Sequence, residues 1–126
     1  MSYPSDLRYT SSHEWVRVTG DVAVVGITHH AQDALGDIVH VELPAVGKQL
    51  KKGATACEVE SVKAVSDVYA PISGVVTEVN DGLNGNESLI NSSPHDGGWL
   101  FKLRIADAGE LGGLLDSAAY TAMEGH

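Results

Sequence analysis

Short runs of alternating apolar and polar residues recur along most of the chain and predict a mainly β protein. The runs are separated by turn signals such as Thr19-Gly20-Asp21 and Asn84-Gly85. Strands are expected at residues 14–18, 22–27, 37–43, 57–62, 64–69 and 99–105. Pro44 should end the strand before it, because proline donates no hydrogen bond to a sheet.

Two segments instead have helical patterns. Thr28 can cap a short helix over 29–35, which Gly36 should end. A second helix is expected over about 107–120, where Leu111, Leu114 and Leu115 form an apolar stripe that should dock on the sheets. Gly112-Gly113 weakens this second helix, by roughly 1 kcal/mol per glycine relative to alanine, so the helix can break there.

The chain should form one domain over residues 1–126, since this length supports a single modest core. Residues 1–12 are mostly polar and are expected to lie on the surface, with Tyr3, Leu7 and Tyr9 as apolar anchors. Residues 121–126 are expected to fray at the C-terminus.

A weak internal repeat suggests how the strands are arranged. Glycine and apolar positions recur at a constant offset of 38 residues: Gly36, Ile38, Val41 and Gly47 match Gly74, Val76, Val79 and Gly85. A duplicated strand-turn-strand unit fits a flattened barrel, or sandwich, of two facing antiparallel sheets. The hairpin 57–69 would then join the two halves.

Lys63 stands alone at the predicted turn of this hairpin, between two valine-rich runs. A lysine in a turn is most often simply solvated. Its small neighbours Ser61, Ala64 and Ser66 would leave the amine accessible to another enzyme. A nucleophilic lysine would instead need an apolar pocket or a cationic neighbour, and this stretch offers neither. The pattern therefore favours a lysine that is modified over one that catalyses.

Composition narrows the function classes. The formal net charge of −9 disfavours binding to nucleic acid or to anionic membranes, both of which require a basic face. No apolar run approaches the roughly 18 residues of a membrane span, and the N-terminus lacks the pattern of a secretory signal. The single cysteine, Cys57, is expected to be buried in a strand, and its solitude fits a reducing compartment.

Other chemistry receives little support. His29 and His30 are adjacent and diverge on a helix, with no ligand four residues on, so no metal site is predicted. Ser12, His13 and Glu14 include the residue types of a catalytic triad, but neighbours on an extended segment point to opposite faces. The chain also lacks the Gly-Lys-Ser/Thr of a phosphate-binding loop.

Several blocks of residues, in the expected order, resemble the glycine cleavage system H protein family. The block Glu60-Ser61-Val62-Lys63-Ala64-Val65-Ser66-Asp67-Val68, followed by Ala70-Pro71-Ile72-Ser73-Gly74, is similar to the lipoylation site of that family. Further matches are Ser12-His13-Glu14-Trp15, Gly26-Ile27-Thr28, His30-Ala31-Gln32, Val41-Glu42-Leu43-Pro44, Leu89-Ile90-Asn91 and Gly98-Trp99-Leu100. The resemblance implies the barrel-sandwich hybrid of lipoyl and biotinyl carriers, with (R)-lipoate attached covalently at Lys63. Glu60, Ser61, Val62 and Ala64 would be recognised by the modifying enzymes.

The resemblance also implies a role as a carrier subunit that is not itself an enzyme. The lipoyl arm would take an aminomethyl group from a pyridoxal-phosphate glycine decarboxylase to a tetrahydrofolate-dependent aminomethyltransferase. Its electrons would pass to dihydrolipoamide dehydrogenase. The loaded arm would fold into a surface cleft at Ser12, Glu14 and Asp67, although without the resemblance both acids would count as ordinary surface residues.

Further expectations concern assembly and location. The partners would be those three enzymes and the lipoylating enzymes, and the carrier would be a monomer. It would lie in the cytoplasm of a bacterium, or in the mitochondrial matrix of a eukaryote after removal of a transit peptide.

Three alternatives remain open from the sequence. A biotin carrier would have the same fold, but that family flanks its lysine with methionines, where this chain has Val62 and Ala64. A lipoyl relay to 2-oxoacid dehydrogenases is compatible with the same pattern. An unmodified interaction domain is a further alternative, against which the intact hairpin and Lys63 argue.

Overall fold

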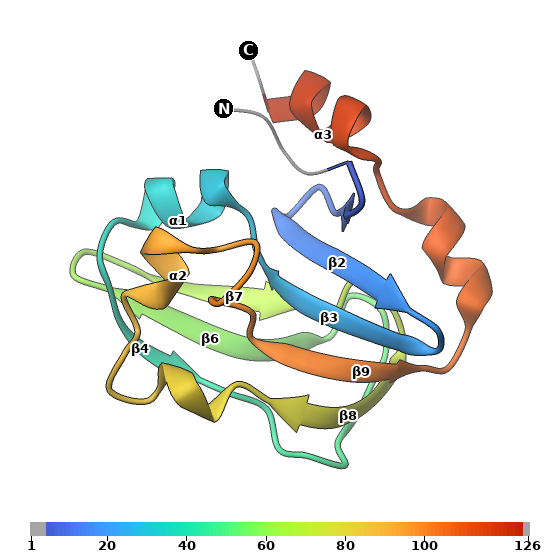
Figure 1. The fold of residues 1–126 in the computed structure, drawn as a ribbon, viewed down its shortest axis with the longest axis horizontal. Coiled ribbons are helices and arrows are strands. Elements are labelled where there is room, and N and C mark those ends of the chain that lie inside the picture. The colour runs from blue at the N-terminus through green and yellow to red at the C-terminus, as the bar shows by residue number, and fades with distance from the viewer. Residues whose placement is uncertain (1–4, 125–126) are drawn as a thin grey trace.

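Two antiparallel sheets form the framework of residues 5–124, the part of the chain that this computed structural model describes (Figure 1). One sheet has the strand order β1-β2-β3-β9-β8-β5, and the other has the order β4-β6-β7. The strands are β1 Arg8–Tyr9, β2 Glu14–Thr19, β3 Val22–Ile27, β4 Ile38–Glu42, β5 Gln49–Leu50, β6 Thr55–Ser61, β7 Val65–Tyr69, β8 Gly74–Val79 and β9 Phe101–Ile105. The predicted architecture of two antiparallel sheets is confirmed, but no ladder between the described strands closes them into a barrel.

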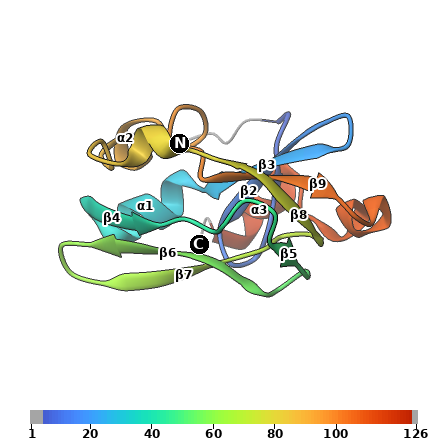
Figure 2. The same ribbon diagram turned by 90° about the horizontal axis from the view of Figure 1, so that it is seen from below.

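The main core lies between the two sheets. It includes Val25, Leu103, Val59 and Val68, which come from both sheets and are almost fully buried. Cys57 on β6 belongs to this core, which confirms its predicted burial in a strand. Figure 2 shows β4, β6 and β7 as one layer beside the larger sheet.

A second cluster packs on the outer face of the larger sheet. It consists of Leu7, Tyr9, Trp15 and Tyr120, each at most 1 % exposed. Gly26 lies opposite Trp15 in the ladder, where a Cβ atom would come within 2.6 Å of the indole ring. The glycine therefore makes room for Trp15, whose Nε1 donates to the Pro94 carbonyl over 2.7 Å.

The helix α1 covers His29–Leu35, as predicted. The Thr28 hydroxyl accepts a hydrogen bond from the Ala31 amide, which satisfies one of the free N–H groups of the first turn. Gly36 ends the helix with φ 84°, a left-handed conformation that suits glycine. A single turn, α2, covers Leu89–Ser92, and a 3-10 turn, η1, covers Asp81–Leu83.

The predicted helix over 107–120 is wrong. The chain forms a 3-10 helix, η2, over Ala108–Gly113, and a separate helix, α3, over Ser117–Glu124. Gly112 and Gly113 weaken the helix at the break. Leu115 then exchanges two 2.7 Å backbone hydrogen bonds with Tyr9, and these replace the helical bonds that its backbone would otherwise make. Residues 121–124 are helical, so the predicted fraying fails there; residues 125–126 lie outside the described chain.

The N-terminal segment does not simply lie on the surface, as the sequence predicted. Arg8–Tyr9 forms β1 and pairs with β2, and both Leu7 and Tyr9 are buried. The two anchors thus belong to the second cluster, whereas the third expected anchor, Tyr3, lies outside the described residues.

The strands that the 38-residue repeat relates, β4 and β8, lie in different sheets. The repeated glycines Gly47 and Gly85 that follow them both have positive φ, at 92° and 82°. No helix in the described part of the chain is both long enough and apolar enough to span a membrane.

Candidate functional site

The hairpin β6–β7 turns at residues 62–64, as predicted, and Ser61 closes the turn. Its amide donates to the Ala64 carbonyl over 2.8 Å, and its hydroxyl accepts from the amides of Ala64 and Lys63 at 3.1 and 3.3 Å. The hydroxyl takes the place of a backbone carbonyl as acceptor. The two central residues of the turn, Val62 and Lys63, do not have positive φ, so the turn is not a type I′ turn of the kind that needs Asn-Gly.

Lys63 is exposed at this turn, which projects from one end of the molecule (Figures 1 and 2). Its neighbours Val62 and Val65 are 68 % and 58 % exposed, a high value for apolar residues. The Val62 amide donates to the Asp37 carbonyl over 3.1 Å, which ties the turn to the chain just after α1. The turn therefore exposes the Lys63 amine together with two valine side chains, and a backbone hydrogen bond to Asp37 holds the turn in place.

A hollow of about 350 Å³ lies at the other end of β7, beside the start of β2. Ser12 and Glu14, two of the three predicted cleft residues, line it together. The full lining is Thr10, Ser11, Ser12, Glu14, Lys52, Gly53, Tyr69, Ala70 and Pro71.

Glu14 is 2 % exposed, so it is not the surface acid that its residue type alone would suggest. Two hydroxyls, of Thr10 and Ser12, donate to its Oε1 atom, each over 2.6 Å. The Tyr69 amide donates to its Oε2 atom over 3.3 Å and so links the carboxyl group to the edge of β7. These three donors make burial of the carboxyl group tolerable.

Burial raises the pKa of Glu14 above its ordinary value, and the hydrogen bonds from Ser12, Thr10 and Tyr69 oppose that rise. Burial also raises the pKa of the Cys57 thiol to about 12, with a smaller contribution from the Glu14 carboxylate. Cys57 is therefore a structural thiol that stays protonated at neutral pH.

Asp67, the third predicted cleft residue, does not line the hollow. It is exposed on β7, opposite Glu58 on β6 and two residues before Tyr69. Side chains two apart on a strand share a face, so Val65, Asp67 and Tyr69 form a row from the lysine turn to the hollow. At about 3.3 Å per residue the row is about 13 Å long, with Asp67 midway.

Thr10 and Tyr69 belong to the hollow but were not predicted. Thr10 reaches the Glu14 carboxyl group across the turn 10–14, and no feature of the sequence predicts that this turn brings the two together. Tyr69 contributes through its backbone amide, and no feature of the sequence marks a backbone donor.

The turn 10–14 has an unusual backbone. His13 has φ 72° and is the one non-glycine residue in the described chain with positive φ. Such a conformation costs roughly 1–2 kcal/mol for an L-residue, although histidine adopts it more readily than most. His13 Nδ1 shares a 2.7 Å hydrogen bond with the Tyr120 hydroxyl, and its ring packs on that of His30 with centroids 4.5 Å apart.

Comparison with known proteins identifies the family. A family model described as glycine cleavage H-protein matches residues 7–126. The glycine cleavage system H proteins of Bradyrhizobium diazoefficiens and Thermotoga maritima are 57 % and 55 % identical to the chain; each match covers 90 % of it, and 93 % and 91 % of the relative. The crystal structure of the Mycobacterium marinum H protein has a TM-score of 0.90 at 39 % identity, over 98 % of this chain and 100 % of that one. The chain belongs to the glycine cleavage H-protein family.

Membership of the H-protein family confirms the predicted role as a lipoyl carrier in the glycine cleavage system, and as a subunit that is not itself an enzyme. The turn and the hollow fit that role in this chain. An exposed lysine on a braced turn suits covalent attachment of a carrier arm, and the hollow supplies a buried carboxyl group at the end of the row on β7. No group of three metal-ligating side chains occurs within residues 5–124.

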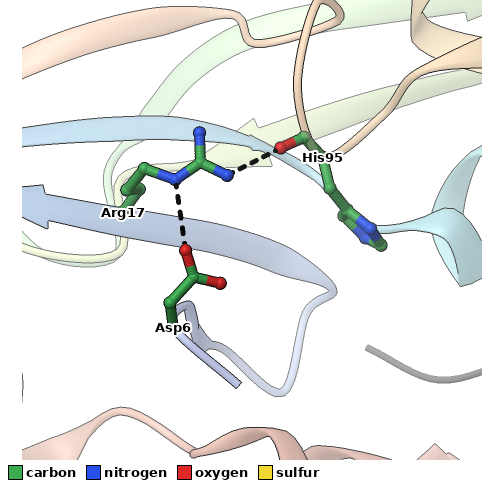
Figure 3. A network of polar contacts seen from close by, with 3 residues as sticks. All are labelled: Asp6, Arg17 and His95. Atoms are coloured by element: carbon green, nitrogen blue, oxygen red, sulfur yellow. Dashed lines mark hydrogen bonds and ion pairs between the residues drawn. The ribbon is translucent and has the colours of Figure 1, made fainter. Parts of the chain in front are cut away.

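A polar network beside Trp15 holds the loop before β9 in this H-protein fold (Figure 3). Arg17 donates to the His95 carbonyl over 3.1 Å and lies 3.8 Å from the Asp6 carboxylate. The His95 Nε2 atom accepts from the His29 amide over 3.1 Å, so it must be unprotonated. Burial, and to a lesser extent the charges of His29 and Arg17, lowers the pKa of His95 to about 4.

Proposed function

We propose that Lys63 carries (R)-lipoate in amide linkage and that the hollow at Glu14 receives the amine end of the group that the arm transports. The observation that supports this most directly is the row on β7, which joins an exposed lysine to a buried carboxyl group. When bound, the lipoyl group supplies the disulfide that accepts the aminomethyl group and the electrons. The chain supplies attachment, position and shelter.

Glu60, Ser61, Val62 and Ala64 have distinct parts in this proposal. Ser61 holds the turn through its hydroxyl, while Val62 is bare and can contact a lipoylating enzyme directly. Glu60 is exposed on β6 opposite Val65, close to the turn, and Ala64 leaves the lysine uncrowded. A modifying enzyme would thus recognise the charge of Glu60, the apolar side chain of Val62 and the shape of the turn.

Ser12 and Glu14 would hold the ammonium end of the transported group inside the hollow. A carboxylate makes stronger hydrogen bonds to an ammonium than a neutral acceptor does, and a partly enclosed site limits contact with water. Asp67 would guide the arm along β7 from outside the hollow. It lies midway along the row, where its exposed carboxylate can meet the arm before the arm reaches Glu14.

The partners that follow are the pyridoxal-phosphate glycine decarboxylase, the tetrahydrofolate-dependent aminomethyltransferase, dihydrolipoamide dehydrogenase and the lipoylating enzymes. The acidic chain, with a formal net charge of −9, suits basic patches on such partners. The reported relatives come from bacteria, which favours the cytoplasm as the place of action.

The test is the intact mass of the protein after incubation with a lipoylating enzyme, lipoate and ATP. We expect one lipoyl adduct, absent from Lys63→Arg, which keeps the charge but cannot form the amide. Lys51→Arg is the matched control, because Lys51 is also exposed but lies away from the hairpin turn, just after β5. An adduct that persists in Lys63→Arg would disprove the attachment site.

A further inference from the structure

The turn 10–14 carries the two hydroxyls that hold Glu14, and it depends on contacts outside the hollow. Thr10 and Glu14 are joined by a 2.9 Å backbone hydrogen bond, and the His13 amide donates to the Thr10 carbonyl over 3.1 Å. His13, with φ 72°, lies between Ser12 and Glu14. Its left-handed backbone reverses the chain so that both neighbouring side chains reach the same hollow.

The imidazole of His13 does not line the hollow and instead contacts side chains of two helices, α3 and α1. Its Nδ1 atom shares a 2.7 Å hydrogen bond with the Tyr120 hydroxyl on α3. Its ring packs against His30 on α1, with centroids 4.5 Å apart and planes tilted by 31°. The His13 carbonyl accepts the Thr28 amide over 3.0 Å, so both the backbone and the ring of His13 are held from one side.

Tyr120 is itself fixed. It is fully buried, stacks on Tyr9 with centroids 4.8 Å apart, and shares a 2.8 Å hydrogen bond with the Thr28 hydroxyl that caps α1. A rigid hydroxyl at this place can hold His13 in a conformation that its own backbone disfavours. The hydrogen bond between Tyr120 and His13 thus links α3 to the turn beside the hollow, although the two residues are 107 positions apart in the sequence.

We propose that Tyr120 and His13 are positioning residues for the Glu14 carboxyl group. Tyr120 holds the His13 ring, His13 holds the left-handed turn, and the turn places the hydroxyls of Thr10 and Ser12 on Oε1. Neither residue touches the transported group. This inference rests on the proposed function, because the hollow that it concerns is the one proposed to receive the transported group. The contacts between Tyr120, His13 and the turn do not involve the lipoyl arm.

The test uses the unmodified protein, so its outcome does not depend on whether Lys63 is lipoylated. Hydrogen exchange of the Tyr69 amide reports on Glu14, since that amide donates to Oε2. Tyr120→Phe removes only the hydroxyl and keeps the ring that stacks on Tyr9. His13→Asn removes the imidazole but retains a residue type that tolerates positive φ.

We expect Tyr69 exchange to accelerate about fivefold in both variants, the factor that one net hydrogen bond contributes. Core amides such as those of Val25 and Leu103 should keep their rates. Thr121→Ala is the matched control, since it removes an exposed hydroxyl from the same helix, and it should change nothing at Tyr69.

Two results would overturn the proposal. One is an unchanged Tyr69 rate in both Tyr120→Phe and His13→Asn. The other is an equal acceleration of core amides and Tyr69, which would mean that these residues only stabilise the fold. A second readout is the Glu14 side-chain carboxyl carbon shift in NMR spectra, which should move in both variants and stay fixed in Thr121→Ala. Failure of lipoylation at Lys63 would leave all these measurements intact and would count against the proposed function alone.

Discussion

Replacing Glu14 with glutamine should make the protein more stable and a poorer carrier at the same time. The change keeps the size of the side chain and its hydrogen bonds, because the amide oxygen can accept from Tyr69 while the two hydroxyls rotate to accept from the new NH₂ group. It removes only the charge, which burial disfavours. The two effects of this single change therefore run in opposite directions.

The stability effect follows from the direction of the pKa shift. Because burial raises the pKa of Glu14, the folded state binds a proton more readily than the unfolded chain does. Wild-type stability must then fall as pH rises from the ordinary value of 4.5 through the raised value. Glu14→Gln lacks this fall, so urea unfolding at pH 7 should show a higher free energy of unfolding for the variant.

The carrier effect follows from the strength of the contact with an ammonium. A hydrogen bond to a charged group contributes about 1.5–3 kcal/mol and a neutral one about 1 kcal/mol, so the loss is about 0.5–2 kcal/mol. That corresponds to about a 2–30-fold smaller preference for the docked arm. The loaded protein should release ammonia correspondingly faster at pH 7, measured with purified components after removal of the decarboxylase.

Glu58→Gln is the matched control, because Glu58 is an exposed acid on β6 and lies outside the hollow. Its ammonia release should equal that of wild type. The reasoning fails if Glu14→Gln holds its amine as long as wild type does, or if Glu58→Gln loses it equally fast. The account of the pKa fails separately if Glu14→Gln is the less stable protein at pH 7.

Three further predictions concern the fold around the site. Cys57, with its pKa near 12 and its side chain buried, should resist thiol reagents at pH 8 and react fully once the protein is unfolded in urea; fast labelling of the native protein would contradict its burial. His95, with its pKa lowered to about 4, should make the free energy of unfolding fall as pH drops from 6.5 to 4, because the unfolded chain takes up the proton first. Urea unfolding should show that this part of the pH dependence disappears in His95→Gln. Gly74→Ala should destabilise the fold by about 1–3 kcal/mol, since its Cβ would lie 2.5 Å from the Arg104 carbonyl oxygen, whereas Gly20→Ala meets nothing within 4 Å and should cost only the strain of its φ of 63°; equal melting temperatures for wild type and Gly74→Ala would contradict the close approach.

Local signals in the sequence were sufficient where one short segment decides its own structure. Thr28 and Gly36 mark the two ends of α1, and the structure places the helix between them. The hairpin β6–β7 follows from the β-branched content of the two short runs on either side of Lys63. Both features depend on residues within a few positions of each other, so no distant contact was needed to predict them.

Local signals failed where a distant contact decides the structure. The apolar stripe at Leu111, Leu114 and Leu115 favours one helix, but Leu115 exchanges its backbone hydrogen bonds with Tyr9 on β1. The leucines are then divided between two clusters: Leu111 and Leu114 pack on the main core and Leu115 on the second. The same pairing explains why the N-terminal segment is buried at Leu7 and Tyr9. Neither pairing partner can be recognised from its own surroundings in the sequence.

The candidate site itself contains the residues that depart most from local rules. The lysine turn has no glycine or asparagine, because the Ser61 hydroxyl acts as the acceptor for its amides. A glutamate is buried, because Thr10, Ser12 and Tyr69 supply three donors from two separate segments. A non-glycine residue, His13, takes a left-handed backbone beside it.

Each of these departures lowers stability unless other contacts compensate, and evolved chains keep such departures mainly where function requires them. All three lie in the turns 10–14 and 61–64, the segments at either end of the row on β7. Their placement is an argument for this site that uses neither the resemblance to a family nor the match to relatives. It also explains why stabilising changes in these two turns, of which Glu14→Gln is the clearest, should be easy to find and should weaken the carrier.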